Sequence, residues 1–574
     1  MVGYKKHLEI LAHRHSGILG ADESGDCRHR QHGILARHVI PRARRPRNHM
    51  SSGSGSRDMK ISRRSFVRAV SAVSASALLP FPFQTFAKEG PVVKTSRGAV
   101  RGLASGGVHV FRGVPCGKNP YVGSLRLAAP EYADAWSGVV DAFSPGGVPL
   151  QFSRDFPGGV KGGGDCLRLN IWTPEPGAAK CPVMVWIPGG GSMNCDNNDP
   201  RFDGTAFAQD GVALVTINYR VNVDGFLKIP GAPANIALRD MLFALRWVRE
   251  NIAAFGGDPD NVTVFGQSAG ATHITSLLAS PLAQGLFRRA ILQSPAALAQ
   301  YDPETADRVA AQMFAFYGVE PSRAAVAAMP FEKLVTYPQF TGPRATDDAW
   351  AELTGGNVAV FKPWYDGEVL TMRPVDAVRQ GCAKDVDILV GSAEDEWRHY
   401  TVPGGAIAEI GPDAAERLVR SAHLAPDLAE QYRKAGRGET PGELFTALQG
   451  DFIFRMPANK VLESQTDAGG RAWAYSFGWK SPVKGESGAE LGAAHSCDVP
   501  FVFKTVEVSR RSLGDNPPPA LAAAMHAAWV NFARKGTPGW TPFDTEKRMT
   551  MVFNENSREV SDPWKFEREA MRLG

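Results

Sequence analysis

The sequence predicts an α/β fold in which a mostly parallel central sheet is covered by helices on both faces. Three observations support this prediction. Apolar strand-like runs alternate with helix-like segments through the middle of the chain, glycine-rich turns follow two of those runs, and no linker or internal repeat divides the region. In such folds the chemistry lies at the carboxyl ends of the strands, so the loops that follow the strands are the first places to search.

The amino-terminal part of the chain differs from the rest. Residues 1–58 lack apolar periodicity and are predicted to be a non-native or disordered leader. Residues 59–87 contain Arg63 and Arg64, then an uncharged apolar run with a small-residue cleavage site that ends at Ala87. This pattern is typical of a twin-arginine signal peptide, although a short membrane-anchoring segment is an alternative. We therefore expect a periplasmic or secreted protein.

Residues 88–574 are predicted to form one catalytic domain with cap insertions, in which segments from about 301 to 364 and from 401 to 455 build the cap and the acyl pocket. The whole chain has a net charge of +5, but residues 1–87 hold 15 Lys or Arg and 5 Asp or Glu. The remainder therefore carries 49 basic and 54 acidic residues. Nothing in this balance favours a nucleic-acid partner, and no later apolar run is long enough for stable membrane insertion. Six cysteines remain without paired C-x-x-C spacing, so we expect no zinc site.

The central elements are predicted from their periodicity. An amphipathic helix over Arg239 to Phe255 ends in a Gly-Gly-Asp-Pro turn, and a strand from Val262 leads to a second helix over Ala269 to Leu278. Phe287 to Gln293 is predicted to be the next buried strand. The order helix, strand, turn, helix, strand indicates a parallel sheet.

The turn between that strand and helix reads Gly266-Gln-Ser268-Ala-Gly270, the G-x-S-x-G pattern. Gly266 and Gly270 lie where a Cβ atom would collide with a strained turn that lifts the serine hydroxyl above the sheet. Ser268 is therefore the candidate nucleophile.

A second glycine cluster follows the apolar strand Val183 to Ile187. Its backbone can approach a ligand closely, and Gly190, Gly191 and Ala269 are the candidate oxyanion donors. A phosphate-binding loop is a weaker interpretation because no G-x-x-x-x-G-K-[ST] pattern is present. A purely structural glycine turn is the remaining alternative.

The candidate base is His495, in a Gly/Ala-rich loop after the predicted strand Arg471 to Phe477. His273 follows Ser268 too closely on one helix, and His526 and His109 are expected within a helix and a strand, so these three are predicted to be structural.

For the acid, a predicted strand from Val386 to Gly391 opens onto a loop with three carboxylates, Glu394, Asp395 and Glu396. One of them should hold the histidine tautomer, and spacing alone leaves the choice open.

Together these residues resemble the type-B carboxylesterases, the cholinesterase-like branch of the α/β-hydrolases. The resemblance covers nearly all of residues 92–560. Besides the motifs above, it includes Phe111-Arg-Gly-Val-Pro115, Gly164-Asp-Cys-Leu-Arg-Leu-Asn170, Phe255-Gly-Gly-Asp-Pro259 and Trp529-Val-Asn-Phe-Ala-Arg534.

The resemblance implies a catalytic triad of Ser268, Glu396 and His495. It implies an oxyanion hole of Gly190, Gly191 and Ala269, and a buried serine, Ser294, that supports the acid.

Three departures stand out. Pro188 replaces the family's usual His or Tyr before the glycines, Gln267 replaces the glutamate of cholinesterases, and Cys166 lacks the family's disulfide partner in residues 143–151.

The expected function is a serine carboxylesterase that hydrolyses small-molecule esters through an acyl-enzyme, without metal or organic cofactor. The family offers monomers and homodimers. The alternatives are hydrolysis of a carbamate, amide, lactone or thioester by the same triad, acyl transfer to an alcohol, and, more remotely, a non-catalytic binding protein on the same fold.

Overall fold

The computed structural model describes residues 88–573, apart from 154, 157–158, 178–179, 336–352 and 357–358. The predicted leader and signal peptide lie outside the described residues. All described residues belong to one compact unit.

A large mixed sheet runs through the molecule in the order β1-β2-β3-β7-β9-β8-β10-β11-β12-β13-β16-β17, with β4 beside β2. The pairs from β9 through β16 are parallel, whereas the pairs toward both edges are antiparallel, apart from the parallel pair of β2 and β4. The predicted mostly parallel central sheet is thus confirmed. The bounds are β1 Lys88–Lys94, β2 Ala99–Ser105, β3 Val108–Pro115, β4 Val139–Asp141, β7 Arg168–Thr173, β8 Cys181–Ile187, β9 Ala213–Thr216, β10 Gly257–Gln267, β11 Arg289–Gln293, β12 Asp387–Ala393, β13 Ala472–Phe477, β16 Met549–Phe553 and β17 Arg558–Ser561. Two small hairpins pair β5 (Gln151–Phe152) with β6 (Val160–Lys161) and β14 (Ser481–Lys484) with β15 (Glu490–Gly492).

Each face of the sheet has its own hydrophobic core. Along β8, the side chains of Val183, Val185 and Ile187 enter one core, whereas those of Met184 and Trp186 enter the other. Successive side chains of a strand point to opposite faces, and here both faces are buried, which explains the continuous apolar run.

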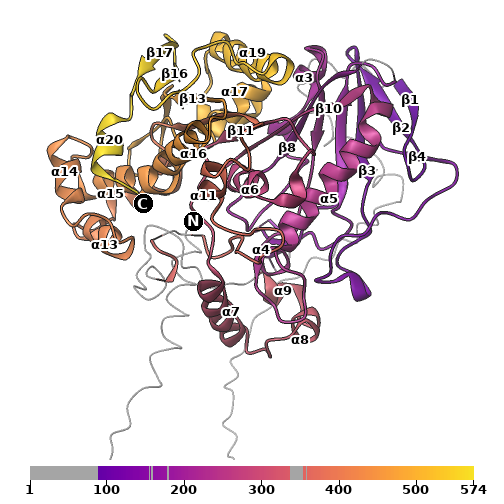
Figure 1. Ribbon diagram of the computed structural model, residues 1–574, viewed down its shortest axis with the longest axis horizontal. Helices are drawn as coiled ribbons and strands as arrows, with labels where there is room; N and C mark the ends of the chain where they lie inside the picture. Colours follow the sequence, from indigo (N-terminus) through magenta and orange to yellow (C-terminus); the bar gives the residue numbers. More distant parts are fainter. Residues whose placement is uncertain are drawn as a thin grey trace, which may run out of the picture. The chain divides into compact units, whose positions relative to one another are not determined.

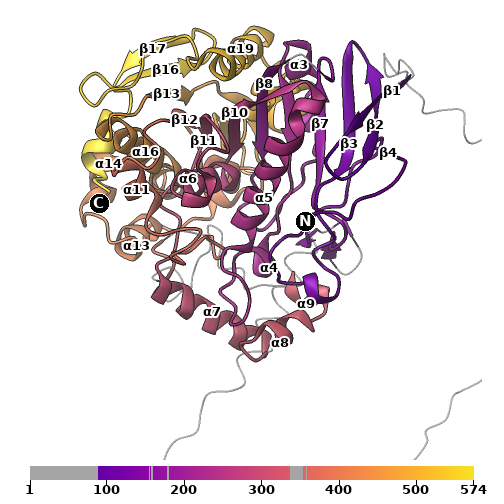
Figure 2. The ribbon, with the colours of Figure 1, turned by 45° about the vertical axis from the view of Figure 1, so that its right-hand side comes forward.

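Helices cover both faces, as Figures 1 and 2 show. The first core receives α5 and α6, and the second receives α17 and α19. The predicted helix over 239–255 is α5 followed by a 3₁₀ turn, which Gly256 ends at φ +84°. The bounds of the helices at the sheet are α3 Thr205–Gln209, α4 Asn222–Phe226, α5 Ile236–Asn251, α6 Ala269–Leu278, α11 Pro374–Arg379, α16 Met456–Asp467, α17 Val499–Phe503, α18 Arg510–Leu513, α19 Pro519–Lys535 and α20 Lys565–Ala570.

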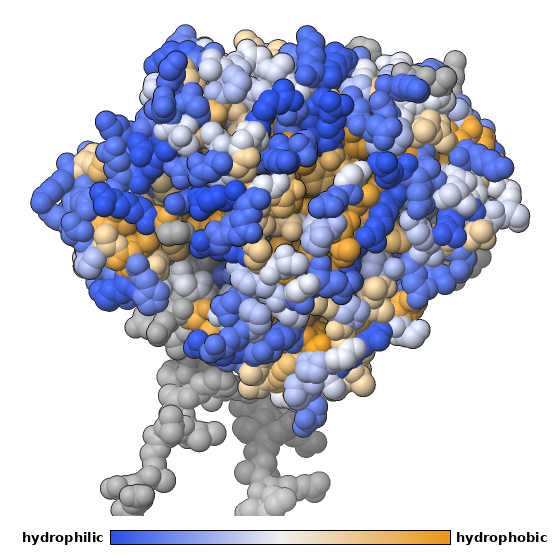
Figure 3. All heavy atoms as spheres, viewed as in Figure 1, coloured by the Kyte–Doolittle hydropathy of each residue, from blue (hydrophilic) through white to orange (hydrophobic). Residues whose placement is uncertain are grey.

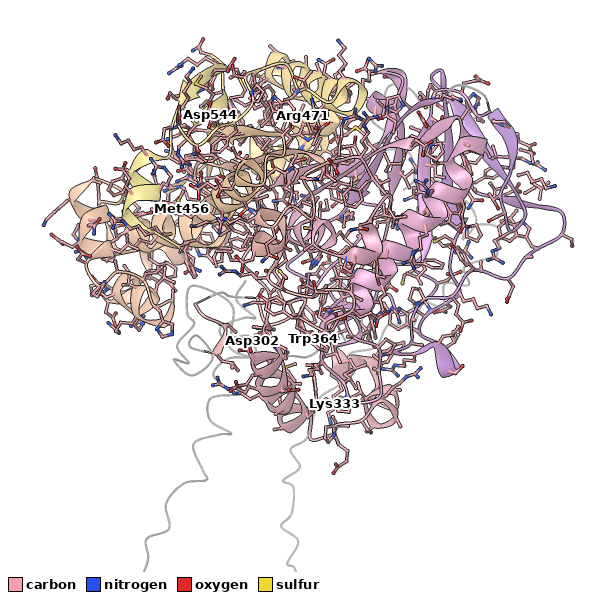
Figure 4. The ribbon with its side chains drawn as sticks, in the orientation of Figure 1. Asp302, Lys333, Trp364, Met456, Arg471 and Asp544 are labelled. Atoms are coloured by element: carbon pink, nitrogen blue, oxygen red, sulfur yellow. The ribbon has the colours of Figure 1, made fainter. Side chains whose placement is uncertain are left out.

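The remaining helices fall in the two segments predicted to build the cap, 301–364 and 401–455, or lead into them. Asp302 caps the first turn of α7, and Tyr301 forms an isolated bridge with Trp364, so the two ends of the first segment meet. Figure 4 labels Asp302 and Trp364 at this junction. These helices are α7 Pro303–Tyr317, α8 Arg323–Ala327, α9 Phe331–Leu334, α12 Arg398–Thr401, α13 Ala414–Ser421, α14 Leu428–Lys434, α15 Pro441–Gly450 and a π-helix over Asp451–Arg455.

The surface in Figure 3 is mainly hydrophilic, with small orange areas between the polar side chains. None of the described helices combines the length and the hydropathy needed to cross a membrane.

Candidate active site

Ser268 lies on a strained turn between β10 and α6. Its backbone has φ +59° and ψ −127°, and its N–H donates to the carbonyl of Gln293 at 2.9 Å. A Cβ atom added at Gly266 or Gly270 would lie 2.6 or 2.0 Å from the carbonyl oxygen of Ile187. Only glycine fits at these two positions, because β8 passes directly beside the turn.

The loop after β8 brings two free backbone donors to the same edge of the sheet. Gly190 has φ +129°, and a Cβ atom there would lie 2.1 Å from the carbonyl oxygen of Asn194. The N–H groups of Gly190 and Gly191 find no acceptor within the described part of the chain. Ala269 is the first residue of α6, where the N–H also lacks an intrahelical partner and the helix dipole is positive.

The departure at Pro188 leaves this loop well anchored. The Tyr219 hydroxyl donates to the carbonyl of Pro188 at 2.7 Å. The missing N–H of proline therefore removes none of the three candidate oxyanion donors.

His495 meets one of the three carboxylates. Its Nδ1 lies 2.5 Å from Oε2 of Glu396, and Oε1 of Glu396 accepts the N–H of Ala393 at 2.7 Å. Both side chains are buried. Asp395 instead accepts the N–H of Ala493 at 2.9 Å, and the pKa of Glu394 is raised by burial. The geometry thus selects Glu396 from the carboxylates that spacing left open.

The other ring nitrogen of His495 has a partner that sequence reasoning missed. Nε2 of His495 lies 3.0 Å from Nε2 of Gln267, and within the described residues His495 itself makes no hydrogen bond to Ser268. An amide nitrogen can only donate, so Nε2 of His495 carries a lone pair and Nδ1 carries the proton. This is the tautomer that a general base requires.

Two aromatic side chains also went unpredicted. The ring of Phe454, in the π-helix, stacks on His495 with centroids 4.3 Å apart, and Tyr400 lies 5.8 Å from the same ring and interacts with the Ser268 side chain. Phe454 has no sequence signal, because a π-helix inserts one residue per turn and shifts every later side chain around the axis.

Ser294 is fully buried after β11, but its Oγ has no hydrogen-bond partner among the described residues. Any support that it gives to Glu396 is therefore not a direct hydrogen bond in this structure.

The histidines expected to be structural are all placed outside the pair of His495 and Glu396. His526 lies in α19, where its Nδ1 hydrogen-bonds the carbonyl of Val502 at 2.7 Å, and His109 lies on β3. His273 is buried in α6, where it borders a cavity described below.

Two cavities meet at Ser268. One, of about 240 Å³, is mostly apolar and is bordered by Met193, Ala299, Phe361, Trp397 and Ile453. The other, of about 530 Å³, is more polar and is bordered by His495, His399, Lys161, Asp199 and Arg201. Burial lowers the pKa of His399 to about 4, so this second histidine is neutral near pH 7.

A serine on a strained strand-to-helix turn, a His–Glu pair and free backbone donors on a doubly covered parallel sheet define a hydrolase of the α/β type. A model of the carboxylesterase family matches residues 89–570, and the chain belongs to this family. The protein is an ester-hydrolysing serine hydrolase, a carboxylesterase.

Relatives with assigned activities agree. The chain is 31% identical over 494 residues to the para-nitrobenzyl esterase of Bacillus subtilis (strain 168), covering 82% of this chain and 96% of that protein. It is 34% identical over 474 residues to the fumonisin B1 esterase of Sphingopyxis macrogoltabida, covering 77% and 82%.

Among solved structures, the chain is similar to the carboxylesterase EST55 of Geobacillus stearothermophilus, with 35% identity, a TM-score of 0.73 and coverage of 84% of this chain and 99% of that chain. Cys166, for which the family's disulfide partner is missing, is a buried free thiol.

Proposed function

We propose that Ser268, His495 and Glu396 hydrolyse carboxylic esters through an acyl-enzyme. His495 takes the proton of Ser268 as the hydroxyl attacks the ester carbonyl, and Glu396 fixes the tautomer and stabilises the imidazolium. The supporting observation is the short contact between Glu396 Oε2 and His495 Nδ1 in a buried setting. His495 then protonates the leaving alcohol, and water repeats the sequence to release the acid.

In this proposal the N–H groups of Gly190, Gly191 and Ala269 stabilise the oxyanion of the tetrahedral intermediate. These donors are free, and the backbone geometry of the loop holds them in place. At Gly190 this geometry requires glycine. Because they need not reorganise during the reaction, they stabilise the charge as it develops.

The hydrogen bond between Gln267 and His495 belongs to the resting state in this proposal. Gln267 and Ser268 are neighbours in sequence, and both compete for the lone pair on His495 Nε2. When an ester occupies the site, His495 exchanges the amide for the serine hydroxyl, in keeping with catalytic hydrogen bonds that tighten only in the substrate complex.

The two cavities are assigned by the position of the base. The leaving alcohol must lie beside His495, which borders the larger polar cavity and not the smaller apolar one. The smaller cavity therefore takes the acyl group. At about 30 Å³ for each water-sized unit, 240 Å³ holds about eight non-hydrogen atoms.

The test is steady-state hydrolysis of p-nitrophenyl esters with acyl chains of 2 to 16 carbons by the wild type, Ser268→Ala and Ser276→Ala. Ser276 is a matched control in the same helix, because within the described part of the chain its hydroxyl donates only to the carbonyl of Thr272. We expect Ser268→Ala to lose at least about 10³-fold in kcat, Ser276→Ala to stay near the wild type, and kcat/KM to fall beyond about eight acyl carbons. Turnover by a folded Ser268→Ala variant would overturn the assignment.

We further propose that residues 59–87 direct twin-arginine export to the periplasm or beyond. The support is the Arg63–Arg64 pair before an uncharged apolar run. Replacing both arginines with lysine should keep the enzyme in the cytoplasm, as shown by fractionation and ester hydrolysis. Unchanged export of the double variant would contradict this proposal.

A further inference from the structure

The apolar acyl cavity contains a buried polar pair, Ser192 and His273. Ser192 directly follows the candidate oxyanion donor Gly191, and His273 lies one turn into α6. Both residues border the cavity and are at most 4% exposed. Their location places polar atoms against the acyl group and not against the alcohol.

The two side chains are bonded to each other. Ser192 Oγ lies 3.3 Å from His273 Nε2, and this is the only hydrogen bond of the hydroxyl among the described residues. The imidazole ring is held between aromatic neighbours, stacked on Phe226 with centroids 4.9 Å apart and edge-on to Tyr219. Burial lowers the pKa of His273 to about 3, so the ring is neutral and has a single N–H.

The bond between Ser192 and His273 leaves one hydrogen-bond donor of the pair unused. The serine hydroxyl and the neutral imidazole supply one donor each, and the bond between them uses only one. The Nδ1 atom of His273 is buried and has no partner in the described part of the chain. A buried N–H without an acceptor costs more than a bare ring nitrogen, so the proton belongs on Nε2, which donates to Ser192. The Ser192 O–H is then left to donate elsewhere.

We propose that Ser192, oriented by His273, forms a polar subsite in the acyl cavity that selects acyl groups with a hydrogen-bond-accepting oxygen, such as an ether, hydroxyl or carbonyl. This inference rests on the proposed function, because it uses the acyl assignment of the smaller cavity. A purely aliphatic acyl chain leaves the buried Ser192 O–H without an acceptor, which disfavours its binding. An oxygen on the chain accepts this hydrogen bond.

The experiment compares p-nitrophenyl esters in pairs that differ only by oxygen in place of methylene: methoxyacetate with butanoate, 3-methoxypropanoate with pentanoate, and 4-methoxybutanoate with hexanoate. For each pair, the ratio of kcat/KM values is measured with full-length wild type, Ser192→Ala and Ser276→Ala. Dividing the wild-type ratio by the variant ratio cancels the intrinsic reactivity of each ester.

We expect the Ser192→Ala substitution to lower the ether-to-methylene ratio by about fivefold for at least one pair, and Ser276→Ala to leave it unchanged. Because Ser192 has φ +62°, Ser192→Gly is the second variant, since glycine keeps this backbone without strain. If Ser192→Ala lowered kcat/KM equally for both members of every pair, the subsite would be overturned and Ser192 would be assigned to support of the oxyanion loop. If the wild type hydrolysed none of the six esters, the proposed function would fail and the subsite with it.

Discussion

At the scale of single residues, the best-predicted positions are those where the backbone leaves no choice. Gly266 and Gly270 could be assigned from sequence because a Cβ atom would collide with the neighbouring strand, and the structure confirms those collisions with Ile187. The acid could not be chosen from spacing, because three successive carboxylates are chemically alike. Only the folded loop directs Glu396 toward His495.

The choice among the carboxylates predicts contrasting variants. Glu396→Gln should lower kcat by about 10³- to 10⁴-fold, because an amide cannot hold the productive tautomer or balance the imidazolium. Glu394→Gln should retain activity, because its carboxylate is not the one that pairs with Nδ1 of His495. Esterase kinetics measure kcat for each variant, and a thermal melt checks that each variant is folded. A larger loss in Glu394→Gln than in Glu396→Gln would reverse the assignment.

His273 also predicts a pH effect on stability. Its folded pKa is about 3, whereas the ordinary value is 6.5, so below pH 6.5 the unfolded chain binds a proton that the folded protein refuses. Stability is therefore lost as the pH falls from 6.5, by about 1.4 kcal/mol per pH unit. The free energy of unfolding, measured with urea, is plotted against pH between pH 6.5 and pH 4.5. Its slope should be smaller for His273→Gln than for the wild type, by the equivalent of about one proton. Equal slopes for the two proteins would mean that the buried His273 ring does not cause the pH dependence of stability.

At the scale of elements, strands and helices with simple periodicity were predictable and the π-helix was not. The predicted helix over 269–278 coincides with α6, and the predicted strands before and after it correspond to β10 and β11. Asp451–Arg455 departs from the 3.6-residue repeat, and this departure brings Ile453 and Phe454 to the acyl cavity. Figure 4 labels Met456, where the regular helix α16 resumes.

The π-helix is tied to the acid loop by Arg455. Its guanidinium bonds Asp451 and the carbonyls of Ala393 and Glu394, and lies 3.7 Å from Glu567. Burial raises the pKa of Asp451 to about 6, and Arg455 opposes that rise. The network therefore positions β12 and the loop that carries Glu396.

Arg455→Met should destabilise the protein by about 3 to 5 kcal/mol, because it leaves the buried carboxylate of Asp451 without its ion-pair partner. It should also lower kcat by loosening the acid loop. Arg433→Met is the control, since Arg433 pairs with Glu416 and Glu430 at the surface, where screening makes such pairs weak. Chemical unfolding of both variants measures the difference, and equal stabilities would show that Arg455 does not hold the network.

At the scale of the whole molecule, the alternation of strands and helices predicted the fold, and a search of the loops that follow the strands led to the candidate site residues. The cap could only be bounded as 301–364 and 401–455, because its short helices pack through contacts distant in sequence. The relative shapes of the two cavities could not be predicted for the same reason, since their walls come from several such segments.

The predicted domain boundary gives a test at this scale. Strand β1 begins at Lys88 and pairs with β2 at the sheet edge. A chain that starts at Lys88 should match the full-length chain in kcat/KM within about twofold and in Tm within about 2 °C, because the described strands and loops that carry the candidate site all lie within residues 88–573. A clear loss in either quantity would place part of the leader in the folded domain.

The central claim is that Ser268 carries the acyl group. The most direct measurement is mass spectrometry of the protein after reaction with a fluorophosphonate, followed by peptide mapping. We expect one adduct, located on Ser268, that abolishes ester hydrolysis in proportion to labelling. An adduct on another residue, or full hydrolysis after Ser268 is labelled, would contradict it.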